Sequence, residues 1–427
     1  MEKISFIINT CADELEHLKL LLNSLKINLD NKEHEIIVFI DSDNQQSTYK
    51  HLKSIKKDFI DLKIITHKLP HCVAYQRNKN LLVKNSKYNI ISYLQSDMVI
   101  SPHYDTDILN SLEPNCILSA IRVEPPLHGD SDKTITKDFG LSPNNFSLKK
   151  WNEYSITVKQ DKSLNYFFAP ITFYKDVWLG IGGYNTLFRR SREDSDLVQR
   201  CLHKGIKLKY TFSAIVYHFT CVSSRGKDWF NKQNTEAQNR LKIQHQADKI
   251  ELRRFIRQWG AFNHGESKLI KYDIDLVIHN CHKLPPNFIY DIEPIFSRVW
   301  LDNINIMKEI IHNNSKEHKY ANQLQNISNT QWEESAKHLF NTVDYNKIFN
   351  RVDKFDNKFN ILLEIDGDTL QNSDMELLNF LHMVIKNNDE VGQYEFGNIK
   401  INIREKKPLT NINVVNPPFD KNLLIIE

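Results

Sequence analysis

The chain has 427 residues, which at about 150 residues per domain predicts two or three domains. Its composition is 41% hydrophobic and 26% charged, with few glycines and prolines, which excludes collagen-like and wholly disordered chains. Lys and Arg total 56 against 53 for Asp and Glu, so the net charge of +3 gives no electrostatic basis for binding nucleic acid or an anionic membrane.

Apolar strands alternate with helical patterns through the first half of the chain. Strands are expected over 4–8, 35–40, 62–66, 88–94, 116–123, 166–174 and 208–217. Helices are expected between them, including one opened by a capping box at Thr10 and Asp13, one over 73–85 and one over 194–204. Strands separated by helices predict right-handed crossovers and a mainly parallel sheet that is covered on both faces.

Two parts of the chain depart from this pattern. Residues 124–165 contain glycines and prolines with little periodicity, so we expect a long irregular connection with a functional role. Beyond about residue 265 the alternation has no clear continuation. Helices are expected over 304–324 and 330–339, and a strand, a helix and a strand over 359–365, 374–386 and 394–403. We assign 1–262 to an α/β domain and 263–427 to a separate α+β region, whose division into 263–355 and 356–427 stays open.

Cysteines and termini predict a cytoplasmic protein. The six cysteines include no C-x-x-C pair, which argues against a zinc ribbon, a redox dithiol and a disulfide scaffold. The first residues do not resemble a signal peptide, and no stretch approaches the roughly 20 apolar residues of a transmembrane segment. We therefore expect a reduced protein without a transmembrane segment.

Acidic residues follow two of the expected strands. Asp41 and Asp43 come after strand 35–40, and Asp97 comes after strand 88–94. Ligands of open parallel sheets bind outside the carboxyl ends of the strands, although Asp also forms turns there. Phosphate-loop, G-x-S-x-G and H-E-x-x-H signatures are absent. A site must therefore be built from scattered carboxylates and one or two histidines.

Seven short motifs, taken in order, resemble the family-two inverting glycosyltransferases of the GT-A fold. They are Ser5–Cys11, Glu35–Asp43, Arg77-Asn78, Gln95-Ser96-Asp97, Gly182-Gly183-Tyr184, Glu193-Asp194 and Val216-Tyr217-His218. The resemblance covers about residues 3–260. It implies a Rossmann-like sheet and a metal-dependent, inverting transfer of a sugar from a nucleoside-diphosphate sugar to a hydroxyl of a glycan or glycoconjugate. The family's first acid of the metal-binding D-x-D turn is Gln95 here, so a lower metal affinity is expected.

The resemblance also implies roles for individual residues. Asp97 and His218 are the expected ligands of Mn²⁺ or Mg²⁺, because a hard divalent cation neutralises a leaving diphosphate. Asp194 is the expected general base that deprotonates the acceptor hydroxyl, with Glu193 and Asp196 as alternatives.

The remaining candidates belong to the two substrates. The nucleotide is expected to contact Thr10, Cys11, Asp41, Arg77 and Asn78, and the diphosphate to be covered by Arg225 and Lys227. The acceptor is expected near Trp178, Gly183, Tyr184 and Glu193, where an aromatic ring would stack on a sugar.

Two other functions stay open at this point. A sugar-nucleotide-forming nucleotidyltransferase would also join an α/β sheet to metal-binding acids, but residues 9–14 lack the Gly, Lys or Arg of its phosphate loop. A non-catalytic protein that binds sugar nucleotides or glycans would explain Gln95 as decay. The C-terminal region is open to roles in acceptor binding, in homo-oligomerisation or as a second enzyme.

Overall fold

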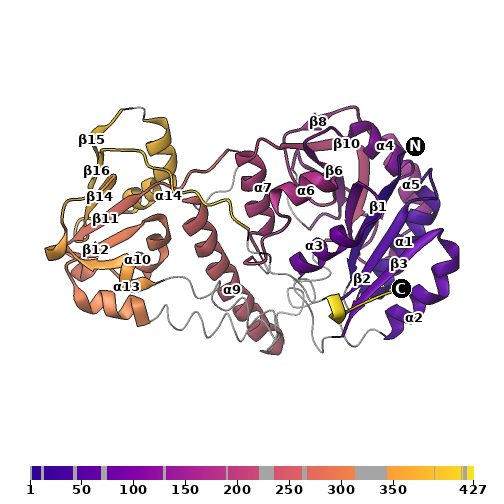
Figure 1. The fold of residues 1–427 in the computed structure, drawn as a ribbon, viewed down its shortest axis with the longest axis horizontal. Coiled ribbons are helices and arrows are strands. Elements are labelled where there is room, and N and C mark those ends of the chain that lie inside the picture. The colour runs from indigo at the N-terminus through magenta and orange to yellow at the C-terminus, as the bar shows by residue number, and fades with distance from the viewer. Residues whose placement is uncertain are drawn as a thin grey trace.

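Two β-sheets organise the chain and lie toward opposite ends of its long axis, with helix α9 (Thr235–Trp259) between them (Figure 1). The computed structural model describes residues 2–10, 14–41, 46–68, 75–127, 131–188, 191–220, 235–261, 267–312, 344–388, 390–414, 416 and 421–427. Within these ranges, no helix combines the length and the apolar character that are needed to cross a bilayer.

The first sheet is mainly parallel. Its strands are β1 (Ile4–Thr10), β2 (Glu35–Ile40), β3 (Asp61–His67), β4 (Ile90–Gln95), β5 (Met98–Ile100), β6 (Cys116–Glu124), β7 (Thr134–Thr136), β8 (Ser163–Leu164), β9 (Ile171–Tyr174), β10 (Lys207–His218) and β17 (Leu424–Ile426). The main order is β17-β3-β2-β1-β4-β9-β6-β10-β5. Parallel pairing of β1 with β2 and β4 places Ile7 between Ile37 and Tyr93. The carboxyl ends of β1, β2, β3 and β4 therefore meet at one edge.

Helices cover both faces of this sheet. They are α1 (Leu15–Asn28), α2 (Gln46–Ile55), α3 (Tyr75–Asn85), α4 (Tyr104–Ser111), α5 (Leu148–Thr157), α6 (Lys175–Ile181) and α7 (Glu193–His203). Alternate residues of β1 point to opposite faces: Phe6 packs with Leu22 of α1, whereas Ile7 packs with Leu82 of α3 and Trp178 of α6. Each fully buried side chain of this kind contributes about 1.5–3 kcal/mol. The predicted α/β fold with a mainly parallel sheet between helices is confirmed.

The second sheet forms a separate region, as predicted. Its strands are β11 (Ile274–His279), β12 (Arg298–Leu301), β13 (Phe349–Arg351), β14 (Ile361–Asp366), β15 (Gly392–Phe396) and β16 (Ile399–Ile403), and its helices are α10 (Pro286–Ile292), α13 (Tyr345–Ile348) and α14 (Asn372–Asn387). The order is β13-β12-β11-β14-β16-β15, in which the first four strands pair parallel and β16 pairs antiparallel with both β14 and β15. Because β14 lies between β11 and β16, residues before and after 355 share one sheet.

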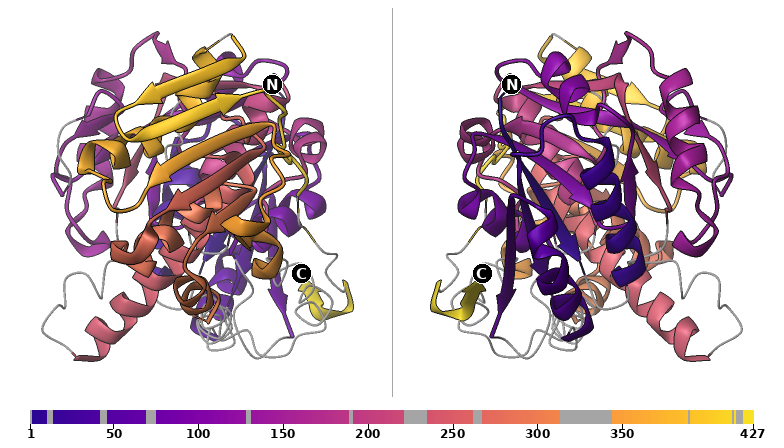
Figure 2. Two further views of the ribbon diagram at one scale, coloured as in Figure 1. Left: turned by 90° about the vertical axis from the view of Figure 1, so that its left-hand side faces the viewer. Right: turned by 90° about the vertical axis from the view of Figure 1, so that its right-hand side faces the viewer.

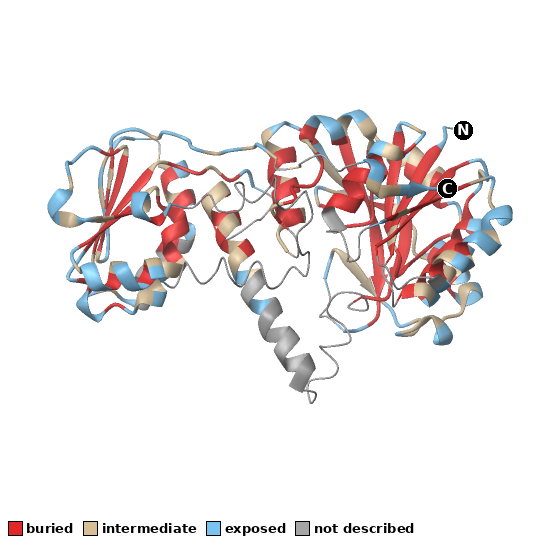
Figure 3. Cartoon of the chain, turned by 60° about the horizontal axis from the view of Figure 1, so that its bottom comes forward, coloured by how far each residue is buried: buried red, intermediate tan, exposed pale blue. Residues whose placement is uncertain are grey.

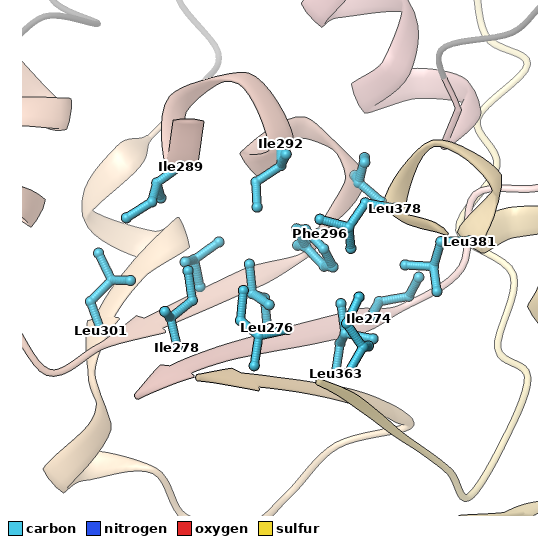
Figure 4. Close-up of a cluster of buried hydrophobic side chains, with 14 of the residues drawn as sticks. Ile274, Leu276, Ile278, Ile289, Ile292, Phe296, Leu301, Leu363, Leu378 and Leu381 are labelled. Atoms are coloured by element: carbon cyan, nitrogen blue, oxygen red, sulfur yellow. The ribbon is translucent and has the colours of Figure 1, made fainter. Parts of the chain in front are cut away.

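An apolar core lies between the second sheet and its helices (Figure 4). Leu276 and Ile278 of β11 point toward Ile292 of α10, and Leu381 of α14 closes the same core. Figure 2 gives the view onto each end of the molecule, and Figure 3 shows that buried residues concentrate on the strands of both sheets.

Some sequence-based expectations need correction. Thr10 does not cap α1, because the backbone of β1 continues to pair with β2 as far as Ile40; the N-cap of α1 is Glu14. Residues 124–165 are not irregular throughout, since they contain β7, β8 and α5, which is capped by the Ser147 hydroxyl. The alternation continues past residue 265 as β11, α10 and β12.

The expected strand over 394–403 is instead the hairpin of β15 and β16. Gly397 turns the chain there with φ of 59°, in the left-handed region that glycine adopts without strain. The chain is helical from 304 to 312, and the remainder of the expected helices over 304–324 and 330–339 lies outside the described residues.

A buried charge cluster joins α9 to the second sheet region. Glu293 is fully buried and accepts hydrogen bonds from Arg253 Nη2 at 2.7 Å and from Arg257 Nη2 at 3.1 Å. Burial alone would raise the pKa of Glu293, but the two guanidinium groups outweigh it and hold the pKa below its usual range. On the same helix, Ile256 packs into the second core and Trp259 packs with Phe188 of the first region.

We expect Glu293→Gln to lower the free energy of unfolding by about 3–5 kcal/mol, because it leaves the buried guanidinium group of Arg253 and the half-buried one of Arg257 without a counter-charge. Urea denaturation followed by circular dichroism would measure the loss. The control is Glu33→Gln, which removes an exposed ion pair with Lys3 and should leave the midpoint unchanged. Equal effects of the two substitutions would contradict a stabilising role for the buried cluster.

Candidate functional site

Asp41 anchors the first group of candidate residues at the carboxyl end of β2. Its carboxylate accepts a hydrogen bond from Asn78 Nδ2 at 2.7 Å, and His67 Nε2 lies 3.2 Å from its other oxygen. The backbone N–H of Asp41 donates to the carbonyl of Thr10 at 3.1 Å, which brings the ends of β1 and β2 together. The Thr10 hydroxyl is buried without a hydrogen-bond partner among the described residues. Three of the expected nucleotide residues thus form one cluster, to which His67 is added.

Consecutive polar residues of α3 are buried and hold different parts of the site. Asn78 binds Asp41, as above. Lys79 Nζ lies 4.1 Å from the ring centre of Tyr93 on β4 and 4.2 Å from that of Tyr184. Asn80 donates to the carbonyl of Tyr184 at 2.8 Å and accepts from its backbone N–H at 2.9 Å. The first turns of α3 therefore tie β2, β4 and the Gly-Gly-Tyr turn to one another.

The expected metal ligands face each other. Asp97 follows β4, and His218 ends β10 opposite Met98 of β5. His218 Nε2 lies 3.6 Å from Asp97 Oδ2, which is beyond hydrogen-bond length. On the other side of the ring, His218 Nδ1 lies 2.7 Å from Glu124 Oε1. Because an ionised carboxylate only accepts, Nδ1 donates to Glu124, and Nε2 is the ring nitrogen that faces Asp97.

This donor set fits a divalent cation. One carboxylate oxygen and one imidazole nitrogen, 3.6 Å apart, can both touch one ion at bond lengths of about 2.1 Å. Both side chains are buried, at 4% exposure for Asp97 and 7% for His218. The described residues contain no group of three or more acidic, His or Cys side chains placed to share an ion. The other ligands would have to come from a diphosphate and water.

The expected general base, Asp194, lies close enough to Lys79 for its charge to act on the ammonium group. Asp194 is the second residue of α7, and its Oδ1 accepts a hydrogen bond from the Tyr184 hydroxyl at 2.7 Å. It is partly exposed, unlike its neighbour Glu193. Burial raises the pKa of Glu193, and the charge of Asp194 adds to the shift. The Asp194 carboxylate is therefore accessible to solvent and is held in one orientation by the Tyr184 hydroxyl.

The other alternative base, Asp196, is buried, and its carboxylate is held by hydrogen bonds from other side chains. Its carboxylate accepts hydrogen bonds from Arg200 Nε at 2.8 Å, from Gln258 at 3.0 Å and from the Trp259 indole at 3.1 Å. Asp196 is completely buried, so it cannot meet an incoming hydroxyl. Its role is to join α7 to the end of α9.

Asp97 and Asp194 belong to one electrostatic environment. Burial raises the pKa of Tyr93 well above its usual value, and the charges of Asp194 and Asp97 both add to the shift. Burial lowers the pKa of Lys79, whereas the charges of Asp194 and Glu193 oppose that effect. Residues from β4, α3 and α7 therefore meet around one buried ammonium group, which sequence reasoning did not identify.

The aromatic candidates for the acceptor site lie in the core. Trp178 is 2% exposed, and its ring stacks on Phe173 at 4.4 Å. Tyr184 is fully buried. Neither ring has a free face for a sugar, so we do not retain them as stacking residues. Gly183 has φ of 69°, and a side chain there would collide with Asn80, which explains why glycine occupies the turn.

Three further candidates lie outside the described residues: Cys11, Arg225 and Lys227. Arg77 is described and buried, at 4% exposure, in the first turns of α3 beside Asn78.

We expect Trp178→Ala to lower the free energy of unfolding by about 3–5 kcal/mol, because it empties a stacked core position. Leu179→Ala is the matched control on the same helix, since Leu179 is 51% exposed and should change stability little. Thermal unfolding of both variants would measure the difference. A small effect of Trp178→Ala would show that the indole is not a core residue and would return it to the acceptor candidates.

Comparison with known proteins finds only distant structural similarity. No protein-family model and no curated protein sequence matches this chain. Among solved structures, S. aureus TarS aligns at 13% identity and a TM-score of 0.40 over 76% of this chain and 55% of TarS. GalNAc-T7 with UDP, GalNAc and Mn²⁺ aligns at 12% identity and 0.40 over 51% and 44%. The mannosyltransferase PcManGT from Pyrobaculum calidifontis, in complex with GDP-Man and Mn²⁺, aligns at 13% and 0.37 over 58% and 64%. This chain thus matches about half of the length of GalNAc-T7 and TarS, and its function has to be argued from its own side chains.

Proposed function

We propose that this chain is a metal-dependent, inverting glycosyltransferase that moves a sugar from a nucleoside-diphosphate sugar to a hydroxyl of a glycan or glycoconjugate. The observation that supports this most is the grouping of two separate acids around Tyr93: Asp97, which faces His218, and Asp194, which is held by Tyr184. Such a transfer needs a cation-binding acid for the leaving group and a second acid for the acceptor.

The donor would bind along the carboxyl ends of β1, β2 and β4. Asp41, oriented by Asn78 and His67, would accept hydrogen bonds from the base or the ribose. The Thr10 hydroxyl, which has no hydrogen-bond partner within the described part of the chain, lies at the end of the adjacent strand and would bind the same nucleotide. Asp97 and His218 would hold the divalent cation, which would neutralise the charge that develops on the diphosphate.

Asp194 would act on the acceptor. As the acceptor oxygen forms its bond to the anomeric carbon, the bond from that carbon to the diphosphate breaks, and the hydroxyl proton passes to Asp194. Among the described residues the Tyr184 hydroxyl binds Oδ1, and Oδ2 would take this proton. The site lies at the first turn of α7, where the helix dipole favours a carboxylate. Attack from the face opposite the leaving group inverts the configuration.

We expect Asp194→Asn to reduce turnover by about 10²–10⁴-fold with little change in nucleotide affinity, because the amide cannot take the proton. Product formation from a radiolabelled sugar nucleotide would measure turnover. Asp176→Asn is the control, since Asp176 is exposed in the first turn of α6. Wild-type turnover in the Asp194→Asn variant would exclude Asp194 as the base.

We expect UDP-, GDP- or dTDP-sugars to raise the melting temperature in a thermal-shift panel, and Mn²⁺ to increase the shift for the true donor. Asp41→Asn should weaken that binding about tenfold, because a charge-assisted hydrogen bond to the nucleotide is lost. Binding without transfer to any acceptor and without donor hydrolysis would favour the non-catalytic alternative. Formation of a sugar nucleotide from a sugar phosphate would favour the nucleotidyltransferase.

A further inference from the structure

Gln95 occupies the position at which the family that this chain resembles has an acid. In the structure its side chain contacts the positively charged Arg122. Its Oε1 accepts a hydrogen bond from Arg122 Nη2 at 3.3 Å. Gln95 ends β4, two residues before Asp97, and Arg122 lies on β6. The amide is therefore turned toward a guanidinium group, and a carboxylate at this position would meet the same positive charge.

Arg122 is fixed by contacts on several sides. It is 6% exposed, its Nε donates to the carbonyl of Ala169, and the guanidinium carbon lies 3.7 Å from the ring centre of Phe168. Its Nη1 lies 3.4 Å from Glu124 Oε1. A buried guanidinium group that is packed under an aromatic ring has little freedom to move, so it can bind only side chains on the neighbouring strands, here Gln95 and Glu124.

Glu124 connects Arg122 to His218, the candidate metal ligand. The oxygen that faces Arg122 is also the oxygen that accepts the Nδ1 proton of His218 at 2.7 Å. Carboxylates in this position fix the tautomer and the ring orientation of metal-binding histidines. A continuous set of contacts therefore runs from Gln95 through Arg122 and Glu124 to His218.

We propose that Gln95 is a positioning residue and not a vestige of a lost metal ligand. Its neutral amide accepts a hydrogen bond from Arg122 but forms no ion pair with it, so the ion pair of Arg122 is made with Glu124. Arg122 thereby orients Glu124 and, through Glu124, His218. This inference rests on the metal site of the proposed function. The cation is then bound by Asp97 and His218, and position 95 does not contribute a ligand.

The inference predicts that restoring the family's acid at position 95 does not raise the affinity for the cation. The carboxylate of Gln95→Asp would attract Arg122 through a full negative charge, which is a stronger interaction than the present amide contact. Arg122 would be drawn away from Glu124, whose hold on His218 would loosen. If position 95 were instead an impaired ligand site, the added carboxylate would tighten cation binding.

The test is a titration of the full chain with Mn²⁺ alone, in which electron paramagnetic resonance measures the free ion. We expect Gln95→Asp to bind Mn²⁺ no more tightly than the wild type. Glu124→Met should weaken binding about 10–100-fold, the range found for such supporting carboxylates. Glu124→Gln keeps an acceptor oxygen for both Arg122 and His218 and should restore most of the affinity.

A second readout separates orientation from general damage. Nitrogen-15 NMR of histidine-labelled protein should find His218 protonated at Nδ1 in the wild type and in Glu124→Gln, and should lose that preference in Glu124→Met. Melting temperatures identify any variant that fails to fold. Tenfold tighter Mn²⁺ binding by Gln95→Asp, unchanged binding by Glu124→Met, or no Mn²⁺ binding by the wild type would each overturn the inference.

These outcomes are distinct from a failure of the proposed function. Wild-type Mn²⁺ binding that responds as expected, in a protein that transfers no sugar, would reject the glycosyltransferase and leave the role of Gln95 intact. Sugar transfer by the wild type, together with tighter binding by Gln95→Asp, would reject only the role of Gln95.

Discussion

The site depends on the burial of polar side chains in the first turns of α3. Asn78, Lys79 and Asn80 are at most 4% exposed, although an exposed lysine or asparagine would ordinarily be hydrated. Each has a different partner: Asn78 pairs with Asp41 at the end of β2, Lys79 lies over the rings of Tyr93 and Tyr184, and Asn80 binds the backbone of the Gly-Gly-Tyr turn. Because buried polar groups are costly unless they are paired, this helix fixes the positions of its partners as well as its own.

Burial also sets the chemistry of the acids. The ordinary response of a carboxyl group to a low-dielectric environment is a raised pKa, as for Glu193. Asp194 differs from Glu193 by being partly exposed and by accepting the Tyr184 hydroxyl. Two adjacent acids thus differ in their access to an incoming hydroxyl because a helix turns them in different directions. Asp97 differs again, since it faces Nε2 of a histidine whose Nδ1 donates to Glu124.

Strand patterns in the first half were predictable because both faces of a parallel sheet are buried, which makes each strand a continuous apolar run. Glu35–Ile40 is an example in which the expected and observed bounds agree. Acids at strand ends were predictable for the same topological reason. Lys79 and Arg122 were not identified as buried residues, because a lysine in a helix and an arginine in a strand give no local sign of burial.

Four successive polar residues, 77–80, did indicate burial of polar side chains. With 3.6 residues per turn they cannot all face solvent on a helix that covers a sheet. Trp178 and Tyr184 were misassigned because an aromatic ring near a glycine turn packs inward as readily as it faces a ligand.

The end of the described chain returns to the first sheet, which no local pattern predicts. β17 pairs antiparallel with β3, and Leu424 lies opposite His67, the residue that contacts Asp41. Hydrogen bonds between Ile64 and Glu427, at 2.8 and 2.9 Å, extend this pairing. Closing a loop of more than 350 residues costs conformational entropy, and folding of the intervening second sheet region reduces that cost because it shortens the free chain. The strand that carries His67, the neighbour of Asp41, is therefore paired with residues that follow the second sheet, so the end of the chain contributes to the structural support of the candidate site.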